Sequence, residues 1–223
     1  MTRRAAGFTL VEIAIGLVIM ALLLGMLMVP LGTQFDQARY AEAQKHLDIA
    51  REAVIGFALA TGRLPCPAQP AKATNSLVPP LAGTEDCTLS LGVLPWAALG
   101  IPETDAWDRR LTYRVTAAFA DAPGAGTLSS FLLTDNGTMT INNGLVDIAT
   151  QVPAVIVSHG KNGLGAFLSN GTQVAGAAGN EAENTDNNVL FISRTNAPDF
   201  DDLVTWVSGN VLKTRMVAAS RLP

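Results

Sequence analysis

Residues 8–31 of the 223-residue chain read FTLVEIAIGLVIMALLLGMLMVPL and contain one charged residue, Glu12. The 19 residues from position 13 to position 31 carry no charge, and as a helix they would reach roughly 29 Å, about the thickness of a hydrocarbon core. Arg3 and Arg4 precede the run, and the next basic residue is Arg39. Because basic residues favour the cytoplasmic side, we expect a single-pass helix with a cytoplasmic amino terminus and a periplasmic body.

Three ordinary interpretations compete for this segment: a cleaved secretory signal, a plain membrane anchor and a buried core helix. The apolar region of a signal is usually about 7 to 15 residues long and ends at a small-residue cleavage site, whereas this run is longer and ends in VPLGTQF. A plain anchor does not account for Glu12. A carboxylate in the apolar run costs about 2.5–3.5 kcal/mol at the helix centre, and less near the interface, unless it finds a partner.

The remainder of the chain is acidic. Of the 15 basic residues 13 follow position 31, as do 18 of the 19 acidic residues, so the body has a net negative charge. Nucleic-acid binding needs a basic surface that neutralises phosphates, and no basic stripe or zinc-finger spacing is present. We therefore exclude nucleic acid as a partner.

The segment Arg3-Arg4-Ala5-Ala6-Gly7-Phe8-Thr9-Leu10-Val11-Glu12 resembles the processing site of type IV pilins and of the pseudopilins of type II secretion. In that family a prepilin peptidase cuts after the glycine, the new amino-terminal Phe is N-methylated, and a Glu five positions in serves filament assembly. The resemblance implies cleavage between Gly7 and Phe8, methylation of Phe8 and an assembly role for Glu12. It also implies a bacterial inner-membrane protein whose partners are prepilin peptidase and other pilin or pseudopilin subunits, contacted through the amino-terminal helix.

The residue types at this site suit such a role on physical grounds. Gly7 lets an extended backbone approach the catalytic carboxylates of a protease without a clashing side chain. Cleavage removes Arg3 and Arg4 and creates a positive amine four residues before Glu12. In hydrocarbon, Glu12 and an amine from a neighbouring subunit would relieve each other's desolvation.

The chain then becomes amphipathic. A stripe with helical spacing predicts one buried face, formed by Tyr40, Ala43, Leu47, Ala50, Val54 and Phe57. Gly62 followed by Leu64-Pro65 predicts the end of the helix. The expected division is therefore a leader peptide (residues 1–7), a transmembrane and spine helix (residues 8–61) and a periplasmic globular α+β domain (residues 62–223).

Cys66 and Cys87 are the two cysteines of the chain. In a periplasmic domain, such a pair most simply forms a disulfide around the Pro-rich segment between them, which would contribute about 3 kcal/mol. The alternative is two free thiols that await a metal or a redox partner.

The body shows strand patterns and a final helix pattern. We expect strands at residues 111–116, 153–158 and 189–193, and a hairpin in which residues 128–133 turn through Asp135-Asn136-Gly137 into residues 138–141. Asp199, Asp201 and Asp202 before an apolar run predict a capped helix from about position 203. The predicted fold class is α+β and pilin-like, with a long amino-terminal helix packed against a carboxy-terminal antiparallel sheet domain.

Two further segments resemble the major pseudopilin of type II secretion. Residues 105–113 (DAWDRRLTY) are similar to its Asp-Pro-Trp-Gly segment, with Asp108 in place of the usual Gly, and residues 158–163 (SHGKNG) are similar to its Ser-Tyr-Gly-x-Asp-Gly turn. Major pseudopilins bind calcium in a loop of this region. The resemblance thus implies a calcium site in the Gly- and Asn-rich stretch 160–188, with the ligands Glu183, Asn184, Asp186 and Asn188. The alternative is a solvated polar loop.

No catalytic motif accompanies His46 on the expected helix or His159 in an expected turn. Ser158 and His159 are adjacent, and in a strand adjacent side chains face opposite ways. We therefore expect a structural subunit and not an enzyme. The alternative is a membrane-anchored periplasmic binding module or enzyme that is not incorporated in a filament. Pilus and secretion pseudopilus, and major and minor subunit, are equally compatible with the sequence.

Overall fold

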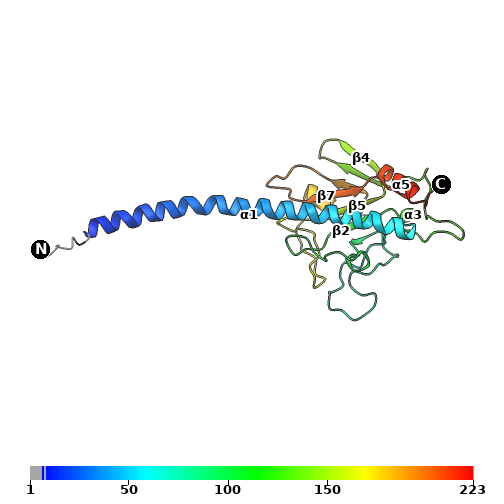
Figure 1. The fold of residues 1–223 in the computed structure, drawn as a ribbon, viewed down its shortest axis with the longest axis horizontal. Coiled ribbons are helices and arrows are strands. Elements are labelled where there is room, and N and C mark those ends of the chain that lie inside the picture. The colour runs from blue at the N-terminus through cyan, green and yellow to red at the C-terminus, as the bar shows by residue number, and fades with distance from the viewer. Residues whose placement is uncertain (1–6, 8, 223) are drawn as a thin grey trace. The chain divides into compact units, whose positions relative to one another are not determined.

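The computed structural model describes residue 7 and residues 9–222, apart from the side chains of residues 26–31 and 33. The chain divides into two compact units, Met1–Ala41 and Glu42–Pro223. Five helices and seven strands are assigned in the described part (Figure 1): α1 Leu10–Thr61, β1 Leu91–Val93, α2 Trp96–Leu99, β2 Thr112–Val115, α3 Ala117–Ala120, β3 Met139–Asn142, β4 Asp147–Val152, β5 Ala154–Ser158, α4 Asn180–Glu183, β6 Leu190–Ile192, β7 Leu203–Val207 and α5 Gly209–Ala218.

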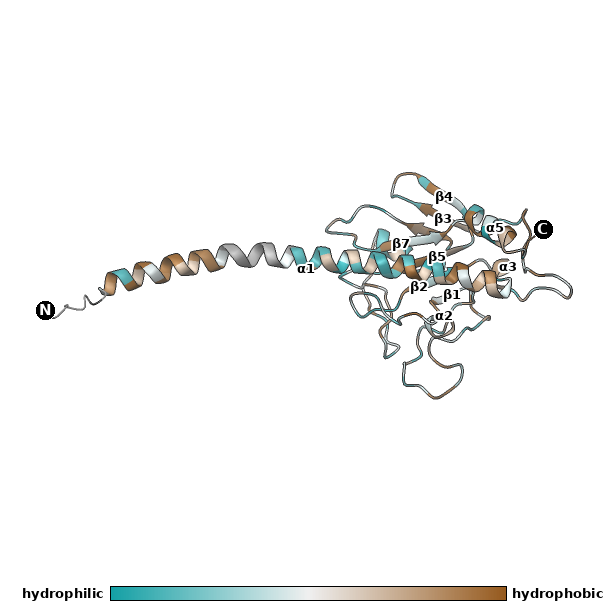
Figure 2. Cartoon of the chain, in the orientation of Figure 1, coloured by the Kyte–Doolittle hydropathy of each residue, from teal (hydrophilic) through white to brown (hydrophobic). Residues whose placement is uncertain are grey.

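The first unit contains the beginning of α1. Figure 2 shows the described first turns of α1 as mostly hydrophobic. Glu12 is the acidic residue of the first turn. A span was expected at residues 13–31; among the described residues, however, no helix combines the length and the hydropathy that crossing a membrane requires. The side chains of residues 26–31, the last six of the expected span, lie outside the described part.

In the second unit, α1 carries the buried stripe that the spacing predicts. Ala43, Leu47, Ala50 and Val54 are fully buried, and Phe57 at the end of the predicted stripe is half-buried. Tyr40, at the other end of the stripe, belongs to the first unit and is half-buried. Ile55 and Ala58 are also buried. After Val54, the buried face of the helix is therefore formed by these two residues and not by Phe57.

The helix ends at Thr61, as predicted. Gly62 has φ +82°, a left-handed conformation, and its N–H donates to Ala58 O at 2.8 Å. A Cβ at this position would lie 2.1 Å from the carbonyl oxygen of Leu128, so both the backbone conformation and the close approach require glycine.

Four antiparallel strands form the main sheet, in the order β1-β2-β5-β7. The central strand β5 is buried at all five positions. Its alternating side chains serve two cores: Ala154 and Ile156 pack with α1 and α5, and Val155 and Val157 pack on the other side. The strands predicted at 111–116, 153–158 and 189–193 correspond to β2, β5 and β6.

A second sheet has the order β4-β3-β6, with β3 and β4 antiparallel and β3 and β6 parallel. Met139, Ile141 and Phe191 of this sheet pack against Val155 and Val157 of β5. The domain therefore has three layers, with helices α1 and α5, the main sheet and the small sheet in that order. The α+β class is confirmed, and the small mixed sheet is an addition to the expected antiparallel one.

Two local predictions were wrong. Residues 128–133 form no strand; instead the Asp135 carboxylate accepts a hydrogen bond from the Leu132 N–H at 2.8 Å, and β3 pairs with β4 and β6. The expected helix from position 203 is β7 followed by α5. Its apolar residues alternate between two packed faces as β7 pairs with β5, and Ser208, not an aspartate, occupies the N-cap position of α5.

Candidate functional site

The first turn of α1 is closed by Thr9 and Glu12. The backbone N–H and the hydroxyl of Thr9 both donate to Glu12 Oε2 at 3.0 Å, and the Glu12 N–H donates to Thr9 Oγ1 at 3.2 Å. This reciprocal arrangement is a capping box, which satisfies amides that no helical carbonyl reaches. The Glu12 carboxylate is therefore held against the backbone at the very start of the helix. The Thr-x-x-Glu spacing is the sequence signal for this cap. The sequence-based prediction gave Glu12 an assembly role and missed its capping role.

Gly7 immediately precedes the expected cleavage point. It is exposed, and a Cβ at this position would meet no atom within 4 Å. Packing within the described chain therefore does not require a glycine here. Phe8, the expected methylated residue, lies outside the described residues, as do Arg3 and Arg4.

The apolar side chains of the first turns of α1 are not buried by other parts of the described chain. More than half of each side chain in a consecutive apolar series is exposed: Leu10, Val11, Ile13, Ile15, Leu17, Val18, Ile19, Met20, Leu22, Leu23 and Leu24. Because these positions cover every side of the helix, no single packing face accounts for them. Apolar surface on this scale marks an interaction with protein or membrane.

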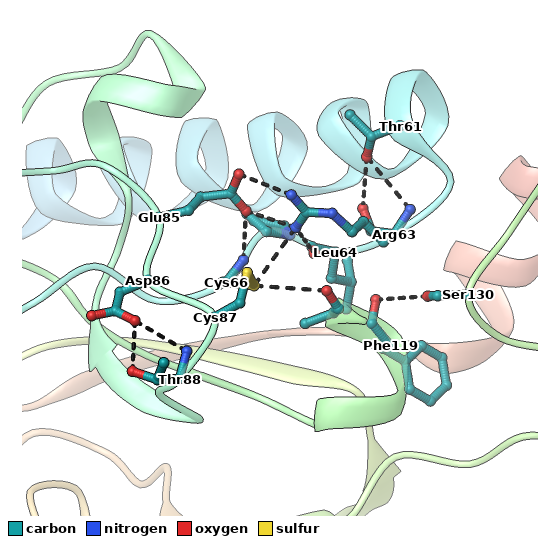
Figure 3. The surroundings of a disulfide bond; sticks show 12 residues. Thr61, Arg63, Leu64, Cys66, Glu85, Asp86, Cys87, Thr88, Phe119 and Ser130 are labelled. Atoms are coloured by element: carbon teal, nitrogen blue, oxygen red, sulfur yellow. Dashed lines mark hydrogen bonds and ion pairs between the residues drawn. A yellow bond between two sulfur atoms is a disulfide. The ribbon is translucent and has the colours of Figure 1, made fainter. Parts of the chain in front are cut away.

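The disulfide Cys66–Cys87 is present, with Cα atoms 5.0 Å apart, so the alternative of two free thiols was wrong. Figure 3 shows Arg63 and Glu85 beside it. The Arg63 guanidinium donates to both oxygens of Glu85 at 2.7 and 3.0 Å, and the Cys66 N–H donates to Glu85 Oε1 at 2.7 Å. The Tyr113 hydroxyl donates to Pro65 O at 3.0 Å, and complete burial raises the pKa of that phenol well above its usual value.

Arg110 connects the disulfide-closed segment to the rest of the body by hydrogen bonds. Its side chain is fully buried and lies over the Trp96 ring at 4.7 Å. The guanidinium donates hydrogen bonds to segments that are far apart in the sequence. Its acceptors, at 2.6 to 3.1 Å, are Glu103 Oε1, Pro70 O, Lys72 O, Thr74 Oγ1 and Ser169 O. Sequence reasoning missed Arg110, because its acceptors come together only in the folded body.

The two segments that resemble pseudopilin turns lie against each other. Asp105 is buried; one of its oxygens accepts the N–H groups of Trp107 and Arg109, and the other accepts the Ser158 hydroxyl at 2.5 Å. Asp108, which stands where the family usually has Gly, has φ +61°. The backbone there takes the left-handed conformation that glycine adopts without strain and that aspartate tolerates.

Ser158 and His159 face different partners, as their adjacency predicts. The Ser158 hydroxyl donates to Asp105, whereas His159 Nε2 lies 2.8 Å from Thr112 Oγ1. The other ring nitrogen, Nδ1, lies 3.5 Å from Asp202 Oδ1, and both side chains are fully buried.

An acidic cluster forms where the 160–188 loop meets the segment before β7. One carboxylate oxygen each of Glu181, Asp201 and Asp202 lies within 4.8 Å of the others. Glu181 Oε1 accepts the Asn162 amide at 2.8 Å and the Asp201 N–H at 3.1 Å. Asp201 Oδ1 and Asp202 Oδ1 are buried with no hydrogen-bond partner. Burial first, and then the nearby Glu181 and Asp202 carboxylates, raise the pKa of Asp201 to about 6.

The four residues expected to bind calcium divide into two groups. Asn184 is fully buried, and its side chain is hydrogen-bonded to the Ile192 backbone and to Asp202 Oδ2. The other three lie together on the surface, where the Asn188 amide donates to Glu183 Oε2 and to Asp186 Oδ2 at 2.8 Å. The structure thus separates Asn184 from the group, and calcium binding stays a prediction.

Comparison with known proteins identifies the amino terminus. Residues 2–28 match the family model described as the prokaryotic N-terminal methylation motif. Comparison with curated proteins and with solved structures gave no significant match. The matched segment contains Gly7, Phe8 and Glu12, the residues on which the resemblance rests. The chain carries the prokaryotic N-terminal methylation motif, the signature of type IV pilin-like prepilins.

Proposed function

We propose that this chain is a structural prepilin-like subunit that is cleaved between Gly7 and Phe8, N-methylated on Phe8 by prepilin peptidase, and assembled into a type IV pilus or a type II secretion pseudopilus. The observation that carries the proposal is the apolar start of α1. Its side chains are exposed on every side of the helix and lie within the segment that matches the methylation motif, residues 2–28. A helix of this kind needs apolar surroundings, which lipid supplies before assembly and other subunits supply afterwards.

Before assembly, the proposed location is the bacterial inner membrane, crossed once by residues 13–31, with the short leader in the cytoplasm and the body in the periplasm. The support is the position of Arg3 and Arg4 before the apolar run, together with the Cys66–Cys87 disulfide, since disulfides persist in oxidising compartments.

In this proposal Glu12 is the residue that registers subunits in the filament. Its carboxylate is bonded to Thr9 within the free chain, and cleavage after Gly7 would place a new ammonium group on the residue next to Thr9. An amine of a neighbouring subunit would pair with Glu12 strongly because attraction between charges increases at low dielectric. The Thr9 cap keeps the carboxylate satisfied until such a partner arrives.

The test compares processing with assembly in cells that contain prepilin peptidase. Glu12→Gln is expected to be cleaved and retained in the membrane, but to be depleted from sheared filaments at least tenfold. Gly7→Val is expected to block cleavage itself. Glu42→Gln, which changes an exposed glutamate of the same helix, serves as the matched control. Normal incorporation of the Glu12→Gln chain would contradict the assembly role.

The alternative function is a membrane-anchored periplasmic module that never enters a filament. It predicts that the unsubstituted chain stays in the membrane fraction and is absent from sheared material. Because cleavage by prepilin peptidase is compatible with both functions, recovery of the chain in filaments is what separates them.

We also propose that the body binds calcium, with Glu181, Asp201 and Asp202 as the principal ligands in place of the four residues expected first. These three offer the hard oxygens that calcium prefers. Asp201 Oδ1 is buried with no hydrogen-bond partner, and the ion-pair contact of Asp202 Oδ1 is with His159 Nδ1 at 3.5 Å. A bound cation would neutralise this cluster and tie the 160–188 loop to the segment before β7.

The neighbouring glutamates of α4 provide a matched test. Glu181→Gln keeps the oxygen that accepts the hydrogen bonds from Asn162 and Asp201 but removes the charge. Glu183→Gln removes the charge of the half-buried glutamate that accepts the Asn188 amide. Titration calorimetry of the full chain is expected to show calcium binding that Glu181→Gln weakens at least tenfold and Glu183→Gln leaves unchanged. If Glu183→Gln alone abolished calcium binding, the site would instead lie at the surface residues Glu183, Asp186 and Asn188. No heat of calcium binding with the unsubstituted chain would overturn the proposal.

A further inference from the structure

The turn between β3 and β4 exposes apolar side chains on a well-ordered backbone. Leu145 is 90% exposed and Val146 60% exposed. Asn143 Oδ1 accepts the N–H groups of both residues at 3.0 and 2.9 Å, and Asn142 Oδ1 accepts the Gly144 N–H at 2.7 Å. Residues 143–146, here called the hairpin tip, therefore present two apolar side chains in a fixed conformation.

A groove of about 500 Å³ lies beside the end of α1. Phe131 and Leu222 are its buried apolar residues, and Leu128, Leu132 and Val217 are exposed along it. Arg221 lines the groove as well and donates to the carbonyl oxygens of Leu59 and Ala60. This surface, here called the end groove, is thus apolar with one cationic wall.

The hairpin tip and the end groove lie at opposite ends of the domain. Strand β4 runs from Asp147, next to the tip, to Val152, which shares a pocket with the first residues of α5. Its six residues span about 20 Å, and Figure 1 shows the β3–β4 connection on the side of the strands away from α5 and the carboxy terminus. One chain therefore cannot fill its own end groove with its own tip.

Two different apolar surfaces at opposite ends of one chain are the arrangement that a heterologous, head-to-tail contact needs, and repetition of such a contact produces a filament. We propose that the end groove receives the hairpin tip of the next copy of this chain, with Leu145 and Val146 as the inserted side chains. The inference rests on the proposed function in that it concerns copies of this chain in an assembly.

Charge favours the hairpin tip over the exposed apolar loop that contains Leu77 and Val78. Asp147 adjoins the tip and is exposed, so it would approach the groove wall at Arg221 with opposite charge. Arg194 also lies beside the tip, but its charge is paired with Asp199 at 2.6 Å. Leu77 and Val78 are also exposed, but Lys72 donates to Val78 O at 3.1 Å. That loop would bring a second cation to Arg221.

Cysteine cross-linking in cells that produce the full-length chain tests the contact. Leu145→Cys and Leu132→Cys are placed on separate chains, which are co-expressed and treated with a short bismaleimide; the native cysteines are paired with each other. The matched control replaces Leu145→Cys by Leu77→Cys, at a side chain with the same 90% exposure. The expected result is at least tenfold more dimer with Leu145→Cys, and a ladder of multimers when Leu145→Cys and Leu132→Cys are in one chain.

Sheared and sedimented material from the same cells separates the two ways in which the idea can fail. Equal cross-linking by the Leu145→Cys and Leu77→Cys pairs in sedimented filaments would overturn the contact while leaving the proposed function intact. Absence of the unsubstituted chain from sedimented material would overturn the proposed function, and the contact with it.

Discussion

Arg63 and Glu85 form a bidentate ion pair beside the disulfide, with N–O distances of 2.7 and 3.0 Å. Each side chain is only 19% exposed, and the same Glu85 carboxylate accepts the Cys66 N–H. Arg63, the second residue after the end of α1, is thereby joined through Glu85 to Cys66, at the start of the disulfide-closed segment. The start of the body is held by charge and hydrogen bonding in addition to the covalent link.

Glu85→Gln is expected to lower the free energy of unfolding by about 2 kcal/mol, because the charge-assisted bonds to Arg63 are lost in a partly buried place. Urea denaturation of the oxidised protein measures this. Glu52→Gln is the control, since that glutamate pairs with Arg215 at the surface with half of its side chain exposed, where ion pairs contribute little. Equal effects of the two substitutions would contradict the account of Glu85.

Replacing both cysteines by serine is expected to cost about 3 kcal/mol, chiefly because the unfolded chain regains the freedom of the closed loop. The sequence separation of the bridged residues is 21. Chemical denaturation of the double variant gives the value. A stability equal to that of the disulfide-bonded protein would show that Arg63, Glu85 and Arg110 alone hold the segment.

Arg110→Met is expected to destabilise the body by about 3–5 kcal/mol, since it leaves Glu103 and several carbonyl groups without their buried donor. Arg114→Met is the matched control, because Arg114 is partly exposed and its guanidinium donates to Asn187 Oδ1 at 2.8 Å. Thermal unfolding of both variants checks the difference. A smaller loss of stability for Arg110→Met than for Arg114→Met would contradict the proposed role of Arg110 in connecting the segment to the body.

Asp201 predicts a specific pH dependence in the presence of a metal chelator. Its folded pKa of about 6 is raised above its ordinary value of 3.8, so the folded state binds the proton more tightly than the unfolded state. The stabilisation from this proton is complete below about pH 4 and is lost as the pH rises through 6. Asp201→Asn should therefore gain stability relative to the parent at pH 7.5, and this gain should shrink at pH 5. A difference that is constant across the range would contradict the raised pKa.

Part of the fold follows from short-range signals in the sequence. The end of α1 was predicted at the right residue because its signals, Gly62 and the following Leu64-Pro65, are local. The stripe from Ala43 to Val54 and the apolar run of β5 follow from spacing and from continuous burial. The disulfide followed because the chain has two cysteines and the sequence indicated an oxidising compartment.

The remainder depends on partners that are distant in the sequence. The spacing of Leu203, Trp206 and Val207 suits one side of a helix, but pairing with β5 fixes them in a strand with two packed faces. The acceptors of Arg110 lie as far away as Ser169, and the Glu181 cluster forms only when α4 meets the segment before β7. No local pattern marks such sites, although the Thr-x-x-Glu cap of α1 could have been read from the sequence.

The central claim is that the chain is a substrate of prepilin peptidase. The measurement that tests it most directly is the mass of the amino-terminal peptide of the protein isolated from cells that contain the peptidase. The account predicts a chain that begins at Phe8, with the seven leader residues removed and a mass increase of about 14 Da for one methyl group on its amine. A peptide that retains residues 1–7, or a chain cut at any other bond, would contradict it.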